Sequence, residues 1–363
     1  MPDRIFAATH KGLFEIARVK GAWDISDTHF LGAPVSSLLA DSGGGVFAAL
    51  DLGHFGAKLW RRDPKSSAWR ELAVPVFPPK PEETGDDPHP WSLGKIWALE
   101  PGGAAGRLWA GTMPGGLFRS DDGGESWSLI EALWRMPERR QWTGVAGGEQ
   151  PGIHSVLVDP RNPADIRIGV STAGMWASAD AGASWRLINR GMYAEYMPPE
   201  RREDPIAQDV HRLARCAAFP DIVWCQHHNG VFRSENAGAD WREITAIRPS
   251  KFGFAVAAHP DDPKTAWFVP AIKDEKRIPV DGKLVVARTS DGGESFEVLT
   301  KGLPQRHAYD LVLRHALDVD ASGRVLAFGS TSGGLWISEN GGDSWAMLDA
   351  RLPPVLAVRF APG

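Results

Sequence analysis

One short segment recurs five times along the chain and constrains the fold more than any other feature. A serine or threonine is followed two positions later by aspartate or asparagine, and after two more positions by glycine. A polar residue stands two positions after the glycine, and an aromatic ring follows it directly. Successive rings are 58, 56, 55 and 49 residues apart, a spacing typical of repeat architectures. The copies are Ser120–Trp127, Ser178–Trp185, Ser234–Trp241, Thr289–Phe296 and Ser338–Trp345.

The residue types in this segment predict a tight turn between two antiparallel strands. The aspartate or asparagine side chain can bond its own backbone a few residues on, and glycine supplies a positive φ. The hydroxyl groups can bond across the turn, and the ring is expected to lie between neighbouring sheets. A short apolar strand precedes each copy and another follows it, as in Gly116–Arg119 and Ser128–Ile130.

Two weaker copies, ending at Trp23 and Trp69, extend the repeat to seven units. Two further apolar strands precede each strand–turn–strand, so four antiparallel strands recur seven times. This pattern predicts an all-β protein, a seven-bladed β-propeller formed by one domain, residues 1–363. The first unit lacks an innermost strand, and Val355–Phe360 is a spare strand that we expect to close the ring by joining the N-terminal blade. The expected blades are 1–33 plus 353–363, 34–75, 93–133, 152–190, 209–246, 252–302 and 308–352.

Composition narrows the function classes. A net charge of -5 without a basic run gives no support to binding of nucleic acid or of anionic membranes. The two cysteines, Cys216 and Cys225, can form neither a disulfide framework nor a thiolate zinc cluster. No run of 18 apolar residues and no signal-peptide pattern occurs, so we expect a cytoplasmic protein without a membrane span. The sequence does not determine the oligomeric state.

The five turns resemble the Asp-box, or BNR repeat. This repeat occurs in sialidases, sortilin-type receptors, xyloglucanase-type glycosidases and a photosystem assembly factor. Three segments are similar to those of bacterial BNR-repeat proteins that are labelled sialidase-like or glycosyl-hydrolase-like. They are Gly152–Ser155, Val170–Gly174 and Leu303–Tyr309. The resemblance covers essentially the whole chain. It implies the propeller fold and leaves the substrate open, because the repeat lies at the outer turn of each blade.

Most of the histidines map to one end of the expected channel. His154, His211 and His315 each lie five residues before the end of an innermost strand, and His228 lies in a turn that reaches the same face. Neutral imidazoles from several strands can bind Zn, Fe, Cu or Mn, so these four are the predicted ligands of a divalent metal. The alternatives are hydrogen bonds to channel water, or general acid–base catalysis by one histidine. Of the neighbouring histidines, His10, His54 and His227 are predicted to contact the substrate, and His307 is predicted to act in catalysis.

Three long connections, 74–94, 131–151 and 189–209, precede innermost strands and are expected to cover the channel mouth. Trp142 and Tyr196 are predicted to stack on a sugar or aromatic ligand, and Arg139 to bind a carboxylate. Glu149 is the predicted catalytic base. The alternative for each of these residues is ordinary loop packing.

These residues favour one function over two others. A true sialidase is excluded, because only three tyrosines are present and none can be paired with a glutamate. We favour a metal-assisted hydrolase or lyase that acts on a small polar molecule. A glycoside hydrolase using loop carboxylates, Glu149 with Asp204 or Asp209, would instead act on a saccharide. The third hypothesis is a non-catalytic ligand-binding or assembly scaffold.

Overall fold

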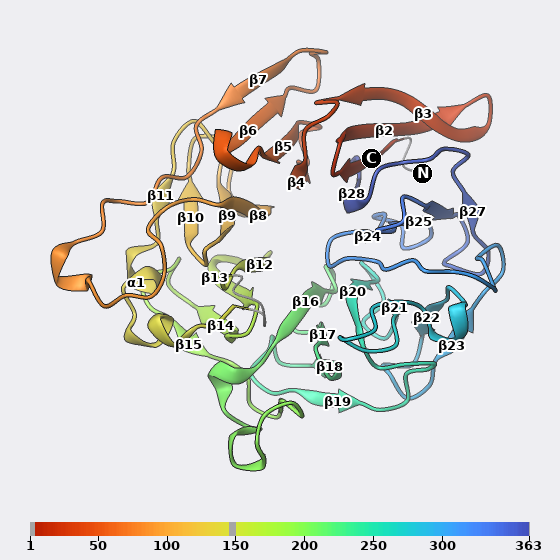
Figure 1. The fold of residues 1–363 in the computed structure, drawn as a ribbon. Coiled ribbons are helices and arrows are strands. Elements are labelled where there is room, and N and C mark those ends of the chain that lie inside the picture. The colour runs from red at the N-terminus through yellow and green to blue at the C-terminus, as the bar shows by residue number, and fades with distance from the viewer. Residues whose placement is uncertain (1–3, 145–149, 363) are drawn as a thin grey trace.

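The seven predicted blades are present. A computed structural model describes residues 4–144 and 150–362 and arranges them as seven four-stranded antiparallel sheets around a central axis (Figure 1). The innermost strands β28, β4, β8, β12, β16, β20 and β24 contact one another in sequence and complete the ring. No helix in these two ranges is long and apolar enough to cross a membrane.

The strands of each sheet follow one another from the axis outward. The first three sheets are β28 (Val355–Phe360), β1 (Arg4–Thr9), β2 (Gly12–Val19), β3 (Ala22–His29); β4 (Val35–Ala40), β5 (Val46–Asp51), β6 (Ala57–Arg62), β7 (Trp69–Leu72); and β8 (Lys95–Pro101), β9 (Leu108–Met113), β10 (Leu117–Ser120), β11 (Ser128–Leu129). The fourth and fifth are β12 (Ile153–Asp159), β13 (Asn162–Val170), β14 (Gly174–Ser178), β15 (Arg186–Leu187); and β16 (Val210–Arg215), β17 (Val223–His227), β18 (Gly230–Ser234), β19 (Arg242–Ile244). The last two are β20 (Gly253–Ala258), β21 (Ala266–Pro270), β22 (Val286–Thr289), β23 (Glu297–Leu299); and β24 (Leu317–Val319), β25 (Leu326–Gly329), β26 (Leu335–Ser338), β27 (Ala346–Met347).

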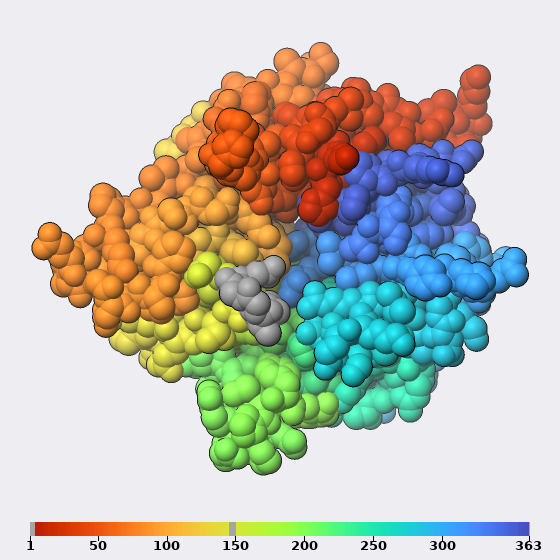
Figure 2. Space-filling view, in the orientation of Figure 1, coloured from red at the N-terminus to blue at the C-terminus, as the bar shows by residue number. Residues whose placement is uncertain are grey.

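Helical turns occupy the connections. They are α1 (Glu131–Trp134) and the 3₁₀ turns η1 (Gly53–Phe55), η2 (Glu82–Thr84), η3 (Pro137–Gln141), η4 (Pro199–Arg201), η5 (Pro205–Ala207) and η6 (Val280–Gly282). Two of the long connections, 74–94 (orange) and 189–209 (green), project from the rim of the molecule (Figure 2).

The C-terminal strand closes the ring, as the sequence predicts. β28 pairs antiparallel with β1, and Ile5 lies opposite Phe360. The two ends of the chain thereby share one sheet, so both termini lie in the first blade (Figure 1). This pairing supplies the first blade with its innermost strand.

Apolar side chains fill the space between neighbouring blades. One cluster joins Met175 of β14 to Leu213, Val223 and Phe232 of the next blade. Three tryptophans, Trp109, Trp224 and Trp267, are almost completely buried in such interfaces. Flat rings and branched chains suit these interfaces because packed sheets offer wide apolar faces.

The five repeated turns form closed hydrogen-bond networks. In the first copy, Ser120 Oγ donates to Asp122 Oδ1 at 2.7 Å and accepts from the Gly124 N–H at 2.8 Å. Asp122 Oδ1 also accepts from the Ser126 N–H at 3.0 Å, and Gly124 has φ 93°. The other four copies repeat these contacts. The turns therefore satisfy most of their own polar groups, and one N–H group of each donates to a carbonyl of the preceding hairpin, as Gly123 does to Gly106.

Candidate functional site

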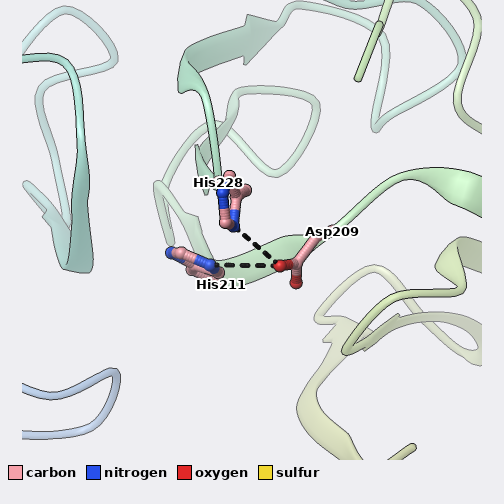
Figure 3. A group of neighbouring side chains, drawn as sticks. All are labelled: Asp209, His211 and His228. Carbon is pink, nitrogen blue, oxygen red and sulfur yellow. Dashed lines mark hydrogen bonds and ion pairs between the residues drawn. The ribbon is translucent and has the colours of Figure 1, made fainter. Parts of the chain in front are cut away.

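Asp209, His211 and His228 lie together where innermost strand β16 begins (Figure 3). His228 Nδ1 is 3.0 Å and His211 Nε2 3.5 Å from the same oxygen, Asp209 Oδ2. His211 Nδ1 donates to the carbonyl oxygen of Gly253 at 2.6 Å. Two imidazoles and one carboxylate thus converge on one point.

Local backbone structure explains why these residues meet. Asp209 directly precedes β16 and His211 is its second residue, so the two stand two positions apart in extended backbone, where side chains share a face. A register shift between Val210 and Arg212 bulges the strand at His211. His228 follows β17, and its backbone N–H donates to the Asp209 carbonyl at 2.9 Å. This bond holds the turn beside the start of β16.

Burial and neighbouring charges shift the pKa values of these three residues in opposite directions. Burial favours the neutral form of Asp209, but His211, His228 and Arg314 outweigh it and hold the pKa well below its usual range. Burial is also the largest influence on His211 and lowers its pKa in spite of Asp209. Burial is the largest single influence on His228 and lowers its pKa, but the hydrogen bond to Asp209 and the charges of Asp209 and Asp274 together outweigh burial and raise the pKa. Near neutral pH the carboxylate is ionised, and the His211 imidazole is neutral.

Aromatic rings enclose the site, and a pocket opens beside it. His211 stacks on Phe254 with ring centres 4.4 Å apart, and Tyr196 meets His228 edge-on at 4.8 Å. A pocket of about 360 Å³ reaches His228. Its wall includes Tyr196 and Phe252, and its rim carries charges of both signs, from Lys251, Lys273, Glu195, Asp274 and Glu275. A small polar molecule fits such a pocket.

Asp209 Oδ1 and His227 Nε2 are buried polar atoms without a hydrogen-bond partner among the described residues. Such atoms also occur in other blades among the described residues, so at this end of the fifth blade they matter only together with the convergence on Asp209. His227 is completely buried against Phe232, and burial lowers its pKa to about 3. It does not line the pocket that reaches His228. Its ring packs into the blade, so the contact of His227 with substrate stays a prediction that this pocket does not support.

The structure brings together two of the four predicted metal ligands, His211 and His228, and not the other two. His154 Nε2 donates to the Val210 carbonyl at 2.7 Å, and its Nδ1 lies 3.0 Å from Ser155 Oγ. His315 Nε2 donates to the His154 carbonyl at 2.7 Å. Both imidazoles are buried, and burial lowers the pKa of each well below its usual range. Hydrogen bonds occupy both nitrogens of His154 and one of His315.

Two loop residues that were expected to contact a ligand are buried in the loop core instead. Arg139 forms an ion pair with Asp87 and lies 3.9 Å above the Trp134 ring. Trp142 is 2 % exposed and packs against Trp176. Both anchor the described part of this connection through these contacts, although Arg139 Nη1 and Trp142 Nε1 have no hydrogen-bond partner among the described residues.

The remaining predicted residues lie in different surroundings. Tyr196 is 43 % exposed, lines the pocket and donates its hydroxyl proton to the Ala207 carbonyl at 2.6 Å. His10, His54 and His307 are exposed and do not belong to the cluster around Asp209. Glu149 lies outside the described residues.

A second group of possible ligands, Glu15, Asp27 and His29, has a different character. Arg62 forms an ion pair with Glu15 and also lies 3.2 Å from His29 Nε2. A guanidinium thus already occupies the position that a metal ion would take. This group is an ion-pair network on the outer strands of the first two blades.

Comparison with known proteins gives matches at three levels. Residues 118–129 match the BNR/Asp-box repeat family. An oligoxyloglucan-reducing end-specific xyloglucanase of Emericella nidulans is 30% identical over 82 residues, which are 22% of this chain and 9% of that protein. The structure of an ancestral GH74 enzyme aligns with a TM-score of 0.59 at 18% identity, over 86% of this chain and 38% of the other. YCF48 bound to a D1 peptide aligns with a TM-score of 0.53 at 14% identity, over 88% and 83%.

The repeat match and the seven sheets together identify the architecture. The chain is a BNR/Asp-box β-propeller. It resembles glycoside-hydrolase propellers in fold, but it spans only a small part of the xyloglucanase and less than half of the GH74 enzyme. These likenesses establish the fold of the BNR propeller, and its chemistry has to be argued from its own residues.

Asp209 lies at the centre of this site, but it is not among the four metal ligands predicted from the sequence. The sequence pattern predicts it only as a loop carboxylate of a glycosidase. The signal that could have found it is the Asp-x-His spacing at the start of a strand, because residues i and i+2 of a strand point to the same face.

Proposed function

We propose that Asp209, His211 and His228 bind a divalent transition metal, and that this BNR propeller uses it to hydrolyse a small polar molecule. Two histidines and one carboxylate are a common ligand set for zinc in hydrolases and for non-haem iron. Such a metal lowers the pKa of a bound water to near neutrality and so supplies a nucleophile. This ligand set replaces the four histidines expected from the sequence.

One observation carries the proposal. Because His211 Nδ1 donates its proton to the Gly253 carbonyl, neutral His211 presents the lone pair of Nε2 to the Asp209 carboxylate at 3.5 Å. Two acceptors in a buried place repel each other unless a proton or a cation lies between them. The Gly253 carbonyl also orients the imidazole, as second partners of metal-binding histidines usually do.

The residues around the triad have distinct tasks in this proposal. His228 faces the pocket, so a substrate there would lie next to the metal. Tyr196 and Phe252 would exclude water from one side of the pocket and contact apolar parts of the substrate. Tyr196 keeps its proton, because burial raises its pKa.

Elemental analysis of the purified, untagged protein tests the metal, together with zinc and cobalt titrations of the chelator-treated protein. We expect near-stoichiometric metal in the parent protein and at least a 100-fold loss of affinity in Asp209→Asn and His211→Gln. The matched control is His54→Ala, an exposed histidine in a connecting turn, which should bind metal like the parent. Circular dichroism would verify that each variant remains folded.

Absence of metal binding in the folded parent protein, even after supplementation, would overturn the proposal. His228 paired with Asp209 would then be the better candidate, as a general base without a metal.

Saccharide hydrolysis is a second candidate, and the similarity to the xyloglucanase of Emericella nidulans favours it. The carboxylates of the pocket, Glu195, Asp274 and Glu275, are the available acids for such a reaction. Release of reducing sugar from xyloglucan oligosaccharides by chelator-treated protein would support this candidate against the metal-assisted one.

A further inference from the structure

The turn that carries His228 also carries Asn229 to the pocket beside the triad. These two residues join β17 to β18, and both form part of the pocket wall. Asn229 is only 7 % exposed, and its backbone N–H donates to His227 Nδ1 at 3.3 Å. It is not one of the three proposed metal ligands, so its place in the wall calls for a separate explanation.

A hydrogen bond fixes which way the Asn229 amide faces. Its Oδ1 accepts from the backbone N–H of Glu195 at 3.1 Å. Turning the amide over would set Nδ2 against this N–H, donor against donor, so the bond determines the positions of both atoms. Nδ2 is buried and has no hydrogen-bond partner among the described residues. Such atoms occur elsewhere in the described chain, but of the side chains in this pocket wall, all of them described, only that of Asn229 has one.

An unpaired amide donor in the wall indicates what kind of atom a ligand would place there. A buried N–H group without a partner costs free energy, which an acceptor atom of a ligand would recover. Nδ2 is covered, so a ligand would reach it after a small rotation of a wall side chain, and such rotations commonly accompany binding. A carbonyl oxygen is an acceptor of this kind. Because Asn229 follows His228 directly, a carbonyl group bound there would lie next to the triad.

The charged groups of the wall favour an uncharged ligand. Apart from His228, which pairs with Asp209, each charged side chain of the wall belongs to an ion pair between a basic and an acidic group. The pairs are Lys251 with Glu195 at 2.8 Å, Lys273 with Glu275 at 3.4 Å and Asp274 with Arg277 at 2.6 Å. They leave no surplus charge of either sign in the wall. A charged ligand would have to break one of these pairs, whereas a neutral ligand would not.

We propose that this pocket binds a small neutral carbonyl compound, an amide or an ester, and that Asn229 donates a hydrogen bond from Nδ2 to its carbonyl oxygen. The idea rests on the proposed function in one respect, that the triad acts on this carbonyl group. In that hydrolysis water adds to the carbonyl carbon, the bond to the amide nitrogen or ester oxygen breaks, and the leaving atom takes a proton from the water. A donor at this place stabilises the negative charge that develops on the carbonyl oxygen. The volume of about 360 Å³ suits a small molecule.

Calorimetric titration of the chelator-treated full chain tests the inference. The probes are δ-valerolactam, a neutral cyclic amide; piperidine, the same ring as a cation without the carbonyl; glutarate, a dianion; and xylose, a neutral saccharide. We expect saturable binding of the lactam and weaker binding of the other three. Asn229→Asp keeps an acceptor for the Glu195 N–H but removes the donor, so it should bind the lactam about tenfold more weakly. Asn340→Asp, in one of the repeated turns, is the matched control and should bind like the parent.

The probes and the variant give independent outcomes. Equal or tighter binding of any of the other three probes, absence of lactam binding, or unchanged lactam affinity in folded Asn229→Asp would each overturn the inference. The order of the probes is measured on the parent protein, so it tests the inference even where the variant does not fold. Metal titration of the same samples distinguishes the two proposals. Preference for the lactam without metal binding keeps this inference and removes the proposed function, whereas metal binding without that preference does the reverse.

Discussion

The two ends of the blades differ in how their polar groups are satisfied. At the end that carries the repeated turns, every copy bonds its first hydroxyl, its carboxylate or amide and several of its backbone N–H groups within eight residues, as Ser178, Asp180 and Gly182 do. At the opposite end, partners come from residues far apart in the sequence, as His211 bonds to Gly253 and His228 to Asp209. Unpaired buried atoms occur at both ends, at Asp209 Oδ1 and His227 Nε2 and, beside the turns, at Nε of Arg119, Arg233 and Arg288. The ends therefore differ in whether contacts are local or join distant segments.

The largest effect that this comparison predicts is a loss of folding stability at acidic pH, caused by the buried histidines of the channel mouth. The described buried histidines His154, His211, His227 and His315 have lowered pKa values, so the unfolded chain binds protons that the folded protein does not. Stability is therefore retained above about pH 6.5 and lost as the pH falls below it, by about 1.4 kcal/mol per pH unit for each histidine. Urea denaturation between pH 7.5 and 5 measures this slope.

His227→Asn sharpens the same test. The amide oxygen can replace Nδ1 as the acceptor of the Asn229 N–H without a titrating group. We expect the slope to decrease by about one proton, or about 1.4 kcal/mol per pH unit. An unchanged slope would show that His227 does not remain neutral in the folded protein.

The repeated turns should respond to mutation in stability alone. Ser178→Ala removes the acceptor of the buried Gly182 N–H and the donor to Asp180, which should cost about 1–3 kcal/mol of unfolding free energy. Metal affinity at the channel mouth should match that of the parent. A change in metal affinity would contradict the separation of the two ends.

Metal affinity should depend on pH through His228. Its raised pKa means that a proton competes for Nδ1. Affinity is therefore expected to be constant above the pKa of His228 and to fall up to about tenfold per pH unit below it. Cobalt titrations from pH 8 to 6 measure the effect, and His228→Gln should bind more weakly and lose this dependence.

The smallest effect is expected at Asn340, in one of the two copies of the turn that have asparagine in place of aspartate. In Asn340→Asp the side chain can accept from the Ser344 hydroxyl, as Asp291 does from Ser295, so stability at pH 7 should change by less than about 0.5 kcal/mol. The new carboxylate should have a lowered pKa like that of Asp291. Its contribution would be present above about pH 4 and lost as the pH falls further, which denaturation at pH 7 and pH 3.5 can compare with the parent.

Part of the site could be predicted from the sequence. His211 and His228 are expected at the channel mouth because strand order and turn position follow from the repeat. Asp209 was recoverable from its spacing to His211. The buried positions of Arg139 and Trp142 could not be predicted, because their partners Asp87 and Trp176 lie on other segments. Nothing in the local sequence distinguishes an anchoring arginine from one that binds a ligand.

Local chemistry and tertiary contacts thus determined different things in this protein. The repeated turn, the period of its aromatic rings and the spare strand Val355–Phe360 determined seven blades and a closed ring, since each acts within a few residues or through strand pairing alone. Only the tertiary structure decided which histidines remain available. His154 bonds to a carbonyl of the next blade, and His315, in the seventh blade, bonds to a carbonyl of the fourth. His211 Nε2 and His228 Nδ1 lie beside Asp209. The physical reason is that these bonds depend on how seven sheets are rotated about one axis, which no single segment encodes.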